Sequence, residues 1–144
     1  MRKSLHYLLA LVLSGVFFAS YMDLLSHVLY YNEQHQLFLY TADYYHSQTL
    51  TGWLTAFVVQ FFHYPLLGAA VMAALLTAVY LMTWRILTAL TRREDILRLS
   101  LIPSLALWVW TAGLSHTLSV VVWAFIVLAV LSVPACFLAK GKTI

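Results

Sequence analysis

Residues 66–84 read LLGAAVMAALLTAVYLMTW, an apolar stretch without a charged side chain. A helix needs about 20 such residues to cross a hydrocarbon layer about 30 Å thick, because each residue advances about 1.5 Å. The stretch therefore predicts a membrane-spanning helix. Its glycine and alanines give the helix a side of small residues, which lets a second helix approach closely, from this chain or from a partner.

The composition agrees with a membrane protein. Of 144 residues, 63% are hydrophobic and 9% are charged, and the mean hydropathy of +0.87 is too high for a surface that faces water. Lys and Arg occur in short clusters beside apolar stretches, which is typical of orientation signals, so we expect no nucleic-acid partner. We predict an all-α, polytopic membrane protein whose first partner is the lipid bilayer.

The chain divides into four predicted spans within a single membrane domain, residues 1–144. Pro65 separates the second span from the segment before it, because a proline inside a helix removes a hydrogen bond and clashes with the preceding turn. The segment 23–64, rich in tyrosine and ending in a short aromatic helix, is expected to rest in the outer interface as interfacial helices. The spans are expected at about 5–22, 66–84, 96–112 and 118–138, with a cytoplasmic loop at 85–95.

The positive charges predict the orientation of these spans. In this arrangement all eight basic residues lie on one side of the membrane, which the positive-inside rule assigns to the cytoplasm, together with both termini. The start of the chain is similar to a secretory signal, but Phe17 and Phe18 occupy positions where a cleavage site needs small residues. We therefore expect residues 5–22 to remain as an uncleaved first span.

Polar chemistry gathers in the predicted outer segment. Three carboxylates, Asp23, Glu33 and Asp43, are the candidate catalytic residues. Such a carboxylate can act as a general base toward an acceptor hydroxyl, or can bind a divalent cation together with histidine. The alternative is that these side chains only solvate an interfacial loop. Five histidines occur nearby in the outer segments: His27, His35, His46, His63 and His116.

Other chemistries find less support. No pair of histidines is spaced by three or four residues within a span, so we predict no haem or metal site and leave the cofactor open. Cys136 is the only cysteine, which excludes an internal disulfide and an oxidoreductase that works through a cysteine pair. No charged residue falls in the middle of a span, which disfavours a proton-coupled exporter.

Two stretches resemble the amino-terminal part of an uncharacterised family of large multi-spanning inner-membrane proteins of Bacteroidota: residues 31–45, YNEQHQLFLYTADYY, and residues 51–71, TGWLTAFVVQFFHYPLLGAAV. The likeness covers about the first two thirds of the chain. Family members are longer, so it implies a short or truncated relative. It also implies a multi-pass protein of the bacterial inner membrane, but no settled function.

The order of the elements is similar to the start of the membrane-embedded C-type glycosyltransferases. In both, a first span is followed by a long outer loop with an early acidic residue, interfacial helices, a second span and a short basic inner loop. The resemblance implies a lipid-linked substrate and a catalytic carboxylate at Asp23, with Glu33 as the competing candidate. Those transferases have many more helices than four, so independent catalysis is not implied.

Two hypotheses follow, and whether the chain is an enzyme stays open. It is either the amino-terminal module of a glycosyltransferase-like membrane enzyme, or a non-catalytic subunit that packs against a partner membrane protein or another copy of itself. A transporter or channel ranks third, because the spans have no ionisable residue in their middle.

Overall fold

The computed structural model describes residues 2–36, 49–91, 97–113 and 118–140, and in these ranges the chain is all-α, as predicted. The described elements are the α-helices α1 (Arg2–Met22), α2 (Ser26–Gln36), α4 (Leu50–Val59), α5 (Pro65–Thr91), α6 (Leu97–Thr111) and α7 (Ser119–Lys140), and the 3₁₀-helix η1 (Gln60–His63).

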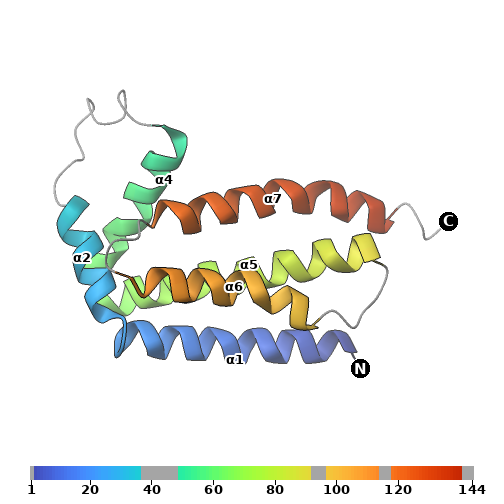
Figure 1. The fold of residues 1–144 in the computed structure, drawn as a ribbon, viewed down its shortest axis with the longest axis horizontal. Helices are drawn as coiled ribbons and strands as arrows, with labels where there is room; N and C mark the ends of the chain where they lie inside the picture. The colour runs from blue at the N-terminus through green and yellow to red at the C-terminus, as the bar shows by residue number, and fades with distance from the viewer. Residues whose placement is uncertain (1, 37–48, 92–96, 114–117, 141–144) are drawn as a thin grey trace.

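Four helices form a bundle with α5 at its centre. Helix α5 packs against α1, α6 and α7, and the four run side by side (Figure 1). Helices α2, α4 and η1 pack on one another and on the bundle at one end, and we call these three elements the cap. The start of α1, the end of α5 and the end of α7 lie at the opposite end of the bundle (Figure 1).

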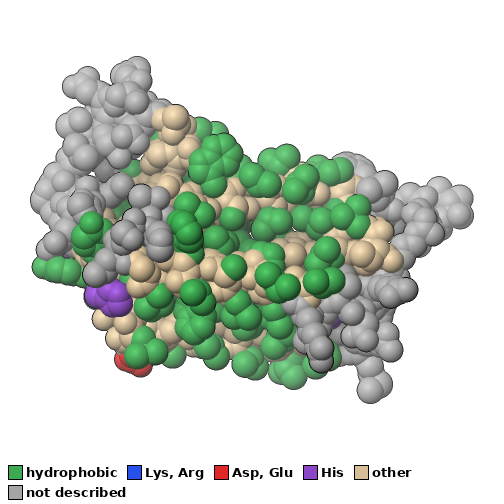
Figure 2. Space-filling model, in the orientation of Figure 1, with side chains coloured by type: hydrophobic (Ala, Val, Ile, Leu, Met, Phe, Trp, Pro, Cys, Tyr) green, Lys and Arg blue, Asp and Glu red, His purple; other side chains and the backbone are tan. Residues whose placement is uncertain are grey.

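The bundle carries apolar side chains on its outside as well as in its core. Phe17, Met72, Leu76 and Val121 are fully buried and form the core together with residues of the cap. Hydrophobic side chains also cover the visible outer face of the long helices (Figure 2). The outer face of α1 illustrates this, because Leu11 is 71% exposed. A surface of this kind fits a hydrocarbon environment better than water.

Length and composition would allow α1 and α5 to cross a membrane. Among the described residues, the other apolar helical stretches are shorter: 50–63, 99–111 and 119–135. Helix α5 also continues past Trp84, where we expected the span to end, and stops at Thr91. Hydropathy predicts where a helix would leave the hydrocarbon, not where the helix ends. Leu87, Ala89 and Leu90 are good helix formers, so the helix continues beyond Trp84.

Pro65 separates η1 from α5, as the sequence indicated. Tyr64 has an extended backbone (φ −105°, ψ 107°), which is the conformation that a following proline favours. Pro65 then takes the first position of α5, where its missing N–H costs nothing. At the start of α4, the Thr49 side chain accepts a hydrogen bond from the Gly52 N–H and caps the helix. The cap is thus bounded by local sequence signals.

Candidate functional site

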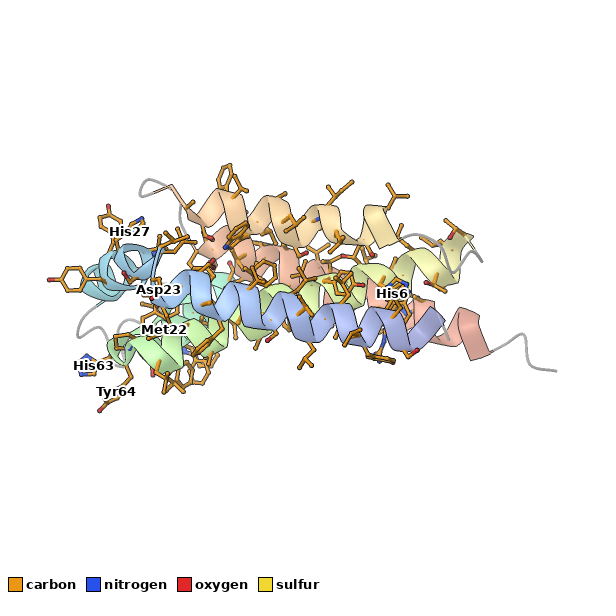
Figure 3. All side chains as sticks on the ribbon, turned by 90° about the horizontal axis from the view of Figure 1, so that it is seen from below. His6, Met22, Asp23, His27, His63 and Tyr64 are labelled. Carbon is orange, nitrogen blue, oxygen red and sulfur yellow. The ribbon has the colours of Figure 1, made fainter. Side chains whose placement is uncertain are left out.

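Asp23 lies in the corner between α1 and α2, and its side chain is exposed. The last turn of α1 holds its backbone, because the Asp23 N–H donates to the Ala19 carbonyl at 3.0 Å. Figure 3 places Asp23 at the cap end of the bundle, close to Met22 and His27. The carboxylate is therefore accessible at the end of the molecule where we expected the polar chemistry.

The structure does not describe the side chains of the other two predicted carboxylates. Glu33 belongs to helix α2, but its side chain lies outside the described residues, and Asp43 lies outside them altogether. The described part of the chain holds no group of three histidine, cysteine or acidic residues that could bind a metal ion. His27 and His63 are exposed at the cap end, where the His63 ring meets the Tyr64 ring edge to face at 5.0 Å (Figure 3).

A buried hydrogen-bond network lies just below Asp23. The hydroxyls of Tyr21 and Thr111 are 2.6 Å apart, and Tyr21 is fully buried. Thr111 donates its hydroxyl hydrogen to the Trp108 carbonyl at 2.8 Å, so Tyr21 must be the donor toward Thr111. This contact ties the last turn of α1 to the last turn of α6.

A second bond joins the same two helices. The Trp108 indole N–H donates to the Ser20 hydroxyl at 3.0 Å, and Ser20 in turn donates to the Phe17 carbonyl at 2.8 Å. The Ser20 side chain is buried, so both groups exchange water for these partners. We call Ser20, Tyr21, Trp108 and Thr111 the outer clasp.

His6 forms a buried polar contact near the other end of the bundle. Its side chain is 3% exposed, and its Nδ1 lies 2.7 Å from the hydroxyl of Tyr80, which is fully buried. The His6 ring also stacks on Trp84, with centroids 4.3 Å apart and planes 17° apart. Tyr80 has a further hydrogen bond to the Ser100 side chain, so this group links α1, α5 and α6.

Sequence reasoning did not single out these polar contacts as a site. The available signal was a hydroxyl, imidazole or indole inside an apolar span, where a polar group needs a partner. That signal says that a partner exists, but it does not identify the partner.

The small-residue side of α5 is used inside this chain. Gly68, Ala69 and Ala73 are buried in the bundle. A Cβ built on Gly68 would lie 3.1 Å from the Phe62 Cα and 3.4 Å from a methyl group of Leu29. The close approach that the small residues allow is therefore between α5 and the cap. The exposed alanines of this helix, such as Ala70, face away from it.

Comparisons with known proteins add one relationship. No curated protein and no solved structure matches the chain. One family model, described as "Family of unknown function (DUF6057)", matches residues 1–142, which extends well beyond the first two thirds of the chain on which we placed the resemblance. The description names no organism, membrane topology or sugar-transfer activity, so these stay predictions. The chain belongs to this family of unknown function, DUF6057.

Proposed function

We propose that the chain crosses the bacterial inner membrane four times, through α1, α5, α6 and α7, with the cap on the outer side. Two features support this. The four helices lie side by side with apolar outer faces, and the start of α1 and the end of α7 are at one end (Figure 1). The described basic residues lie at that same end, at the starts of α1 and α6 and toward the ends of α5 and α7, and the positive-inside rule places this end in the cytoplasm.

On this membrane protein, we propose that the cap end works on a lipid-linked substrate as a module of a glycosyltransferase-like enzyme. The observation that carries the proposal is the position of Asp23. Its exposed carboxylate follows directly on the end of α1, the depth at which lipid headgroups would lie. There the carboxylate acts as a general base that takes the proton from an acceptor hydroxyl. The acceptor oxygen bonds to the anomeric carbon of the sugar, and the lipid phosphate leaves as its bond to that carbon breaks.

A transfer assay with matched variants tests this role. Membranes that contain the chain and its native partners are supplied with radiolabelled lipid-linked sugars, and transfer to endogenous acceptors is followed. Asp23→Asn should lose transfer at unchanged abundance, and Glu33→Ala tests the competing carboxylate. Gln60→Ala, an exposed polar change on the cap, is the control. Full transfer in both Asp23→Asn and Glu33→Ala would refute the catalytic role.

A non-catalytic subunit is the second candidate, favoured by the outer face of α7. In this helix Trp123, Val130 and Val133 are more than half exposed, and α7 packs mainly on α5 and α4. Since Gly68 and Ala73 are buried within the chain, a partner would have to bind elsewhere, and this face is available.

The subunit hypothesis predicts a change of complex mass. Trp123→Ala should shift the mass of the native complex in mild detergent to that of the free chain, whereas Gly68→Val should disturb the fold of the chain itself. A chain that stays monomeric in its native membrane before any substitution contradicts the subunit hypothesis and leaves α7 facing lipid.

A further inference from the structure

Ser20 holds the corner that carries Asp23 through two hydrogen bonds. The Ser20 hydroxyl accepts the Trp108 N–H, and the Ser20 carbonyl accepts the backbone N–H of Leu25 at 2.8 Å. Leu25 is itself buried in the core. Asp23 therefore lies between two residues whose positions are held by the interior of the bundle.

We propose that the outer clasp positions the Asp23 carboxylate relative to the outer end of α6. The inference rests on the proposed role of Asp23 and deepens it, because it names the residues that hold the carboxylate in place. Ser20 and Tyr21 are the positioning residues on α1, and Trp108 and Thr111 are their partners on α6. Asp23 itself has an exposed side chain, so its placement depends on the backbone that carries it.

The geometry favours positioning over a general contribution to stability. Both clasp bonds end in the last turn of α6 and in the last three residues of α1, and Asp23 follows Met22 directly. The bond between Tyr21 and Thr111 is buried, and the bond between Trp108 and Ser20 is partly buried. Such bonds favour one geometry, because a buried polar group that loses its partner remains desolvated. A shift of α6 would therefore move the corner, whereas the loss of the clasp would free the corner from α6.

The bond between His6 and Tyr80 provides a matched control. It is also buried and also joins two helices, but it lies far from Asp23 along α1 (Figure 3). Tyr80→Phe removes one buried hydroxyl and with it the bonds to His6 and Ser100. It should lower stability, as the loss of the clasp should, but only the clasp variant should affect the corner.

Distance measurements between two spin labels test the proposal on the full chain in lipid nanodiscs. With the native cysteine replaced by serine, labels are attached at Leu24 and Ile102, which are exposed on the corner and on α6. Thr111→Val combined with Trp108→Phe removes both clasp bonds. Thr111→Ser keeps the hydroxyl and is the conservative rescue, and Tyr80→Phe is the remote control.

We expect a narrow distance distribution in the parent chain, in Thr111→Ser and in Tyr80→Phe, and a broadened or shifted one in the double clasp variant. An unchanged distribution in the double variant overturns the proposal, and so does equal broadening by Tyr80→Phe. The result is separate from catalysis. If Asp23→Asn and Glu33→Ala both retain full transfer, the proposed function fails, while the distance measurement still decides whether the clasp holds the corner.

Discussion

Replacing Gly68 by alanine tests whether the small-residue side of α5 serves this chain. The added Cβ would lie 3.1 Å from the Phe62 Cα and 3.1 Å from its ring, closer than ordinary van der Waals contact. Because one of these atoms is backbone, η1 must shift to make room. Overpacking of this kind costs about 1–3 kcal/mol. The gain from replacing glycine inside a helix is about 0.5–1 kcal/mol, so Gly68→Ala should be destabilising by up to about 2.5 kcal/mol.

Gly15→Ala is the matched control for this prediction. Gly15 lies within α1, is exposed, and has nothing within 4 Å of a Cβ built on it. The same chemical change should therefore stabilise the chain there by about 0.5–1 kcal/mol. The difference between the two variants isolates the overpacking at Gly68, since the helix gain is common to both.

The measurement is reversible unfolding in mixed micelles with increasing SDS fraction, followed by circular dichroism. The expected order of stability is Gly15→Ala, then the parent chain, then Gly68→Ala. If Gly68→Ala is as stable as Gly15→Ala, helix α5 does not pack on Phe62 as described, and its small-residue side becomes available to a partner.

Further predictions concern the polar contacts and the topology. Tyr80→Phe leaves Nδ1 of His6 without this partner and should cost about 1–2 kcal/mol in the same unfolding assay, because both groups are buried. Tyr7→Phe keeps the edge contact of its ring with Trp84 and should change stability by less than about 0.5 kcal/mol. If Tyr7→Phe and Tyr80→Phe lower the stability equally, the buried contact of His6 with Tyr80 has no special role. The topology can be tested in a chain that lacks the native cysteine. A membrane-impermeant maleimide should label Leu24→Cys in intact spheroplasts, but Leu90→Cys only after lysis. The reverse pattern of labelling would invert the proposed topology.

The division of the chain into helices could be read from the sequence because its signals are local. Pro65 forced a helix start, and the structure begins α5 there. The predicted span ends before Arg85, where the charged residues begin, but a charged residue does not stop a helix. Helix α5 therefore covers residues 85–91, which we had assigned to a loop.

The candidate site was readable only in part. Asp23 was recognisable as an acidic residue directly after an apolar stretch, and the structure places it in an exposed corner. Its supports were not recognisable, because Tyr21 meets Thr111 from 90 residues away along the chain. A hydroxyl within an apolar span needs a hydrogen-bond partner, but the sequence does not say which of several helices supplies it.

The sequence by itself determined the all-α class, the apolar character of the helices and the break at Pro65, because hydropathy and proline act locally. Only the tertiary structure decided what the inward faces meet. It packed Gly68 against Phe62, paired His6 with Tyr80 and enclosed the outer clasp beneath Asp23. Those contacts depend on which helices are neighbours and on how each is rotated, and in an apolar chain nearly every face is equally able to be buried.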